Sequence, residues 1–187
     1  MFADNFSPLA KQYLQIGPDP NCLVAGGELN LIAGRALCVF NRKRLRTVVC
    51  AYGGRSSYLV EAGGPSESEI MTEYLDFARC SPDFSVPEVL IWPQDRVAPN
   101  KKTNTDQELF NVFELAVKLG YSDVGIVTVL VHYARTLLMA QRYLQYSYFA
   151  DLKLKCFISE ETCLQIHPEM EKRIRSLHGS EAFMRTL

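Results

Sequence analysis

Residues 47–54 read Thr47-Val48-Val49-Cys50-Ala51-Tyr52-Gly53-Gly54, a run rich in β-branched residues that stops at two glycines. A similar unit precedes it, because residues 21–25 form a short apolar run that stops at Gly26-Gly27. Short, continuous apolar runs that end at glycine are typical of strands covered on both faces of a sheet. The two units therefore predict buried strands.

Strand-like and helix-like stretches alternate along the rest of the chain. We expect further strands at residues 88–92, 123–130 and 152–158, and helices at residues 31–40, 66–79, 105–120 and 132–146. Strands that alternate with helices indicate right-handed βαβ units and an open, doubly wound sheet. The predicted fold class is α/β, a three-layer Rossmann-like fold with an open, mostly parallel sheet of about five strands and helices on both faces.

The length of 187 residues suits one domain. We expect a single domain over residues 1–187, with its core in residues 21–158. Two helices, at residues 7–17 and 167–178, are expected as additions to that core.

The composition excludes several classes of protein. Because 20 basic residues are nearly matched by 21 acidic ones, the chain lacks the basic excess of a nucleic-acid binder. No apolar run approaches the ~20 residues that span a bilayer, and the first residues do not resemble a signal peptide. The six cysteines show no CxxC spacing and the three histidines no HxxxH pattern, so we expect buried thiols and no metal site. The chain is thus expected to be soluble and cytoplasmic, with no membrane span and no nucleic-acid partner.

In a doubly wound sheet, ligands bind beyond the carboxyl ends of the strands. The residues expected there from the first half of the chain are Gly26, Gly27, Arg35, Gly53, Gly54, Glu67 and Glu69. The glycines either simply end their strands or let a ligand approach the backbone closely. Glu69 fits a capping box, which leaves Glu67 as the better candidate for binding a hydroxyl or amino group.

The second half of the chain adds a polar group before one helix and another after a strand. Thr105 is the expected N-cap of its helix, and Asn104 is the stronger ligand candidate because capping does not require it. Thr128, His132 and Arg135 follow the next strand, with His132 and Arg135 three residues apart and hence on one helix face. Histidine can exchange protons near neutral pH, and arginine can hold an anion through two hydrogen bonds. The alternative is a histidine that caps the helix and an arginine on its surface.

The order of these motifs resembles the YdcF/SanA/ElyC-like family of bacterial Rossmann-like domains. The matching elements are Gly26-Gly27, Arg35-Ala36, Gly53-Gly54, Glu67 or Glu69, Asn104-Thr105, Val127-Thr128, His132 and Arg135, within Asn21 to Leu144. The resemblance implies a YdcF-like domain of the soluble branch. It also implies a nucleotide-like ligand, with S-adenosylmethionine as a possible cofactor.

Three functions are compatible with this pattern. The first is the binding of a small anionic or adenosine-containing ligand at the carboxyl edge of the strands. The second is a hydrolase or transferase that acts on a phosphorylated or lipid-linked envelope precursor, with His132 as the catalytic acid or base. The third is a non-catalytic interaction protein that has kept the fold.

Overall fold

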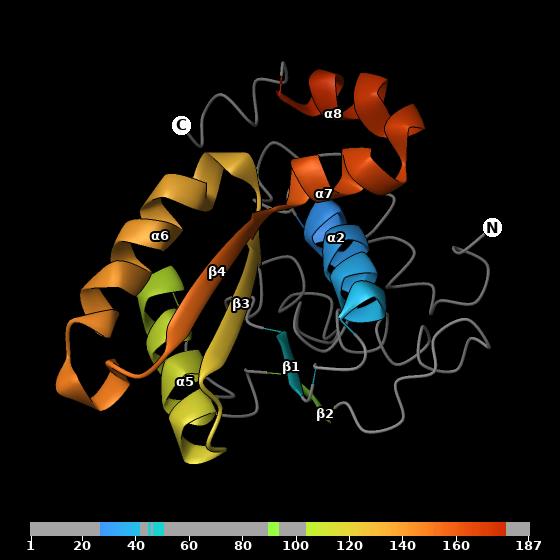
Figure 1. Cartoon of the computed structure of the whole chain (residues 1–187). Helices are drawn as coiled ribbons and strands as arrows, with labels where there is room; N and C mark the ends of the chain where they lie inside the picture. Colours follow the sequence, from blue (N-terminus) through green and yellow to red (C-terminus); the bar gives the residue numbers. More distant parts are fainter. Residues whose placement is uncertain (1–26, 42–44, 46, 51–89, 94–103, 179–187) are drawn as a thin grey trace, which may run out of the picture.

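The computed structural model describes residues 27–41, 45, 47–50, 90–93 and 104–178 (Figure 1). The expected strand at residues 21–25 and the expected helices at 7–17 and 66–79 lie outside these residues. The same holds for five predicted site residues, Gly26, Gly53, Gly54, Glu67 and Glu69.

Helices and strands alternate along the described chain. The helices are α2 (Gly27–Phe40), α5 (Thr105–Lys118), α6 (Leu130–Leu144), α7 (Ser159–Ile166) and α8 (Glu171–His178), with the 3-10 helices η4 (Ser147–Phe149) and η5 (Pro168–Met170). The strands are β1 (Thr47–Cys50), β2 (Leu90–Pro93), β3 (Asp123–Thr128) and β4 (Lys153–Ile158). This order confirms the α/β class, and α7 is a helix that the sequence pattern did not predict.

The strands pair in parallel, as predicted. β1 pairs with β2 from Thr47↔Leu90 onward, and β3 pairs with β4 up to Thr128↔Ile158. The hydroxyl groups of Thr47 and Tyr121 lie 3.0 Å apart, which places the start of β1 near the start of β3. The described residues thus form two parallel pairs, and a single sheet of about five strands stays a prediction.

Helices pack on both faces of β3, because successive side chains of a strand point to opposite faces. On one face, Val124 joins an aromatic-rich cluster with α5, α6 and η4, in which Phe113 and Phe149 are almost fully buried. On the other face, Val127 packs against a cluster built around α2 and α7. Figure 1 shows α5 and α6 on one side of the β3–β4 pair and α2 on the other.

The described thiols follow the expectation from the cysteine spacing. Cys38 and Cys163 are buried, and Cys156 is half-buried. Burial raises the pKa of the Cys156 thiol, so this group stays protonated at neutral pH. In the part of the chain that the structure describes, no helix is both long and apolar enough to cross a membrane.

Gly120 and Gly34 differ in backbone conformation but both have space for a side chain, so alanine substitutions at the two positions test the assigned conformations. Gly120 ends α5 with a positive φ of 72°, whereas Gly34 lies inside α2, and an added Cβ would meet no atom within 4 Å at either position. Gly120→Ala should lower the free energy of unfolding by about 1 kcal/mol, because an L side chain disfavours the left-handed region. Gly34→Ala should raise it by up to about 1 kcal/mol, because alanine is the better helix former. Urea unfolding measures both changes, and an equal effect of the two substitutions would contradict the assigned backbone.

Candidate functional site

The candidate site lies where β3 and β4 end. Thr128 and Ile158 are register partners in the parallel pair, so the two carboxyl ends are at the same level. α6 begins two residues after Thr128 and α7 directly after Ile158. Two helix amino ends therefore lie next to each other at this edge, as the doubly wound arrangement predicts.

His132 and Arg135 meet on the first turns of α6. Arg135 Nη2 lies 3.4 Å from His132 Nδ1, which confirms that the two side chains share one face of the helix. Because a guanidinium only donates, Nδ1 is the acceptor, and the ring proton of a neutral His132 lies on Nε2. His132 is half-buried and Arg135 is exposed, so the guanidinium is the part of the pair that solvent reaches.

The surroundings of His132 favour its neutral form. Burial lowers the pKa of His132 most, the positive charge of Arg135 lowers it further, and the carboxylate of Glu160 partly opposes both. At neutral pH the pair therefore carries one positive charge, on Arg135, beside a neutral imidazole.

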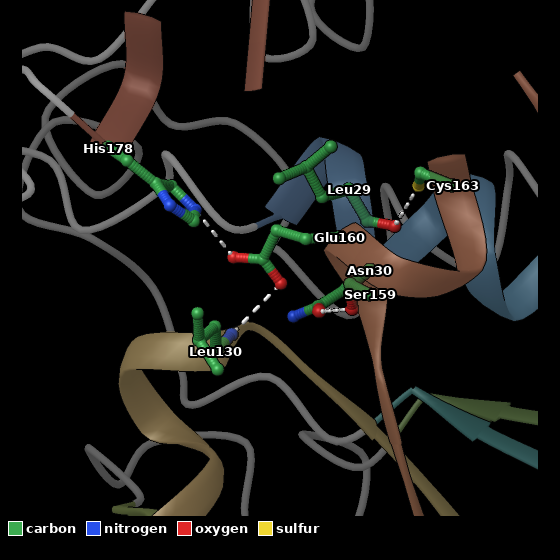
Figure 2. A network of polar contacts seen from close by, with 7 residues as sticks. All are labelled: Leu29, Asn30, Leu130, Ser159, Glu160, Cys163 and His178. Carbon is green, nitrogen blue, oxygen red and sulfur yellow. Dashed lines mark hydrogen bonds and ion pairs between the residues drawn. The ribbon is translucent and has the colours of Figure 1, made fainter. Parts of the chain in front are cut away.

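Glu160 is a buried acid at the centre of this edge (Figure 2). It is only 4% exposed, and its Oε2 accepts a hydrogen bond of 2.9 Å from the backbone N–H of Leu130. Its Oε1 lies 3.1 Å from Nε2 of His178, the last residue of α8. One carboxylate thus connects α6, α7 and α8.

The position of Glu160 follows from the strands, although our sequence reasoning did not select it. It comes two residues after the end of β4, just as the α6 amino end comes two residues after the end of β3. Polar residues that directly follow parallel strands gather at one edge of the sheet. That rule, applied to the last predicted strand, would have selected Glu160. His178 does not follow a strand, so no local sequence pattern would have selected it.

Neighbouring contacts fix α7 against α2. The Ser159 hydroxyl donates a hydrogen bond to Asn30 Oδ1, and the Cys163 thiol lies 3.5 Å from the carbonyl oxygen of Leu29. Both contacts lie near the start of α2, which begins at Gly27. This part of α2 is therefore adjacent to the candidate site.

The structure also describes two other predicted site residues, Arg35 and Thr128. Arg35 is a half-buried residue of α2, five residues after Asn30, which contacts α7. Thr128, the last residue of β3, is buried at 7% exposure. The side chain of Thr128 is therefore packed within the fold at the end of β3 rather than exposed to a ligand.

Asn104, not Thr105, is the N-cap of α5, which corrects the expectation. The Asn104 side-chain oxygen accepts the N–H of Gln107 at 2.9 Å, and Thr105 is the first helical residue. Asparagine is the stronger N-cap of the two residue types, which accounts for the difference. The side chain of Asn104, a predicted ligand contact, therefore caps the helix through its oxygen.

The amino end of α5 also lies away from His132. Asp106, in the first turn of α5, forms an ion pair with Arg142 in the last turn of α6. Arg142 follows His132 by ten residues along α6, about 15 Å at the rise of an α-helix. The structure therefore does not bring Asn104 and Thr105 together with His132 and Arg135.

Comparison with protein-family models, curated proteins and solved structures found no match to this chain. The resemblance of its motif order to the YdcF/SanA/ElyC-like family therefore stays a prediction. Among the residues that the structure describes, no group of three or more His, Cys, Asp or Glu side chains is placed to hold a metal ion.

The lowered pKa of His132 predicts how stability changes with pH. Folding disfavours the protonated ring, so stability is lost as the pH falls from about 6.5, the ordinary histidine pKa, through the lower pKa of the folded state. His132→Gln removes this titration and keeps a polar side chain. Urea unfolding at pH 7.5 and 5.5 should therefore show a smaller acid-induced loss in the variant than in the parent. An identical loss in both proteins would show that burial and Arg135 do not disfavour the charged ring.

Proposed function

We propose that this chain is a soluble, cytoplasmic, YdcF-like Rossmann protein that binds a small anionic or adenosine-containing ligand at the carboxyl edge of its parallel strands. The observation that carries the proposal is the contact between His132 and Arg135 beyond the end of β3. This contact joins a neutral imidazole and an exposed guanidinium at the edge where doubly wound folds bind their ligands.

Arg135 is the group that would hold the anion. A guanidinium has five N–H donors, and its contact with His132 involves one of its nitrogens, Nη2. A carboxylate or phosphate can accept two parallel hydrogen bonds from such a group. The Nε2–H of a neutral His132 supplies a further donor close by.

The buried carboxylate restricts where that anion lies. Glu160 already accepts the N–H of Leu130 at the amino end of α6, and its negative charge repels a second anion there. The ligand's anionic group is therefore expected at the exposed face of Arg135 rather than on the α6 backbone. The one positive charge of Arg135 suits one carboxylate or one phosphate better than a polyphosphate.

S-adenosylmethionine, the cofactor that the family resemblance implies, fits this part of the site through its carboxylate. When bound, it supplies a sulfonium methyl group that can be transferred to a nucleophile. Gly53 and Gly54, predicted to let a ligand approach the backbone, and Glu67, predicted to bind a hydroxyl or amino group, lie outside the described residues. The support from the structure therefore concerns the anionic end of the ligand.

A second candidate function is catalysis on a phosphorylated or lipid-linked substrate. The lowered pKa of His132 fits this role, because a neutral imidazole can take a proton at neutral pH. Nδ1 carries the lone pair of the ring, so it would take the proton from an attacking hydroxyl or water once Arg135 turns from Nδ1 to the substrate's phosphate. Arg135 would then hold the phosphate next to the ring. Loss of turnover in His132→Gln with unchanged substrate affinity would favour this candidate over simple binding.

Calorimetry with S-adenosylmethionine and a panel of mononucleotides tests the binding proposal. Arg135→Gln should weaken the affinity of the bound compound about tenfold or more, because hydrogen bonds to a charged group contribute about 1.5–3 kcal/mol. Arg142→Gln is the matched control, since Arg142 is an exposed arginine of the same helix that pairs with Asp106. Binding that Arg135→Gln and Arg142→Gln weaken equally, or no binding by the folded parent, would contradict the proposal.

A further inference from the structure

α8 is a short helix that depends on its docking contacts. It spans only eight residues, Glu171–His178, and helices below about 12–15 residues are marginal in isolation. The described contacts of α8 include an exposed ion pair between Arg175 and Glu171, but both residues belong to α8 itself, so this pair does not attach the helix to the fold. The order of α8 must therefore come from residues that attach it to the rest of the fold.

Two described side chains make that attachment. Ile174 is 4% exposed and belongs to the apolar cluster with Leu29, Val129 and Cys163. His178, at the end of the helix, points toward Glu160, with 3.1 Å between Nε2 and Oε1. Figure 2 shows the Glu160 carboxylate between the ring of His178 and the backbone nitrogen of Leu130.

The amino end of α6 has no side-chain cap of its own. Val129 occupies the N-cap position and makes no side-chain cap hydrogen bond. The carboxylate of Glu160, from α7, accepts the N–H of Leu130 in its place. The first turn of α6, which carries His132, is therefore capped by a residue from a different helix.

The two hydrogen bonds of Glu160 depend on each other. A buried carboxylate is stable only when both oxygens have partners, because the desolvated charge is otherwise too unfavourable. If α8 left, Oε1 would lose His178, and the carboxylate would lower its free energy by turning toward water. That rotation would remove Oε2 from Leu130 and leave the first turn of α6 uncapped.

We propose that α8 is a latch on the candidate site, which couples its own docking to the order of the first turn of α6 through the chain His178–Glu160–Leu130. Displacement of α8 would loosen the turn that carries His132, and docking of α8 would restore it. The regulatory meaning of the latch rests on the proposed function of His132 and Arg135. The mechanical coupling itself is a property of the ligand-free protein and is tested there.

Amide hydrogen exchange of the full chain, measured by NMR without ligand, tests the coupling. In His178→Ala, the amides of Ile174 and Leu130 should both exchange about tenfold faster or more. Ile174 lies in α8, which loses the docking contact of His178, and the Leu130 amide loses its acceptor, Glu160. The amide of Phe113, in the core on the other side of the sheet, should be unchanged and so excludes global destabilisation. Lys172→Ala, at an exposed position of α8, is the matched control and should leave all three rates as in the parent.

A second variant keeps the test decisive if His178→Ala folds poorly. In His178→Gln, an amide N–H can replace the donor of the ring, so protection at Leu130 should be largely retained. Faster exchange at Ile174 alone would overturn the proposal, because α8 would then leave without affecting α6. Unchanged rates at both amides, or an equal increase at Phe113, would overturn it as well. Failure of the calorimetric experiment on Arg135 would remove the proposed ligand but would not change these rates.

Discussion

The hydrogen bond from the Leu130 N–H to the buried carboxylate of Glu160 holds together the end of the molecule where α6, α7 and α8 meet. Parallel pairing of β3 with β4 brings the amino ends of α6 and α7 to one level, and such ends carry unpaired N–H groups and partial positive charge. The N-cap residues, Val129 and Ile158, provide no side-chain hydrogen bond. An acid placed between these helix ends supplies both an acceptor and a compensating charge. The arrangement of His132 in the first turn of α6 depends on it.

The position of the Glu160 carboxylate also reduces the number of groups that could bind an anion at this edge. The sequence pattern suggested a broad edge with several donors, but the carboxylate of Glu160 occupies the amino end of α6. Asn104 caps α5, and the amino end of that helix lies beside Arg142 rather than His132. The exposed guanidinium of Arg135 is the cationic group that the structure places in contact with His132, whose imidazole burial keeps neutral. We therefore propose a site for one anionic group, with a neutral imidazole beside it.

The features that sequence predicted well are those determined by near neighbours. β3, β4 and α5 form within a few residues of their predicted bounds, because apolar periodicity and a left-handed glycine at 120 specify them locally. The contact between His132 and Arg135 follows from their spacing on a helix. The N-cap of α5 was assigned to Thr105 instead of Asn104, since both types are acceptable caps and only geometry distinguishes adjacent candidates.

The features that sequence missed depend on residues far apart in the chain. α7 is eight residues long and begins Ser159-Glu160-Glu161, which offers no apolar periodicity to identify a helix. A glutamate is almost never fully buried unless it is paired, and the partners of Glu160 come from α6 and from the end of α8. The pairing of β3 with β4 brings the starts of α6 and α7 together, and the path of the chain after α7 brings the end of α8 to them. Burial of an acid is therefore a tertiary property that local patterns do not contain.

The most direct test of this account is the free energy of unfolding of Glu160→Ala, measured by urea denaturation beside Glu161→Ala. The two glutamates are adjacent in α7, but Glu160 is buried and Glu161 is exposed. We predict a loss of about 2–3 kcal/mol for Glu160→Ala, which removes the cap of α6 and the partner of His178. We predict a change within about 0.5 kcal/mol for Glu161→Ala. Equal small effects of the two substitutions would contradict the claim that one buried carboxylate holds this edge together.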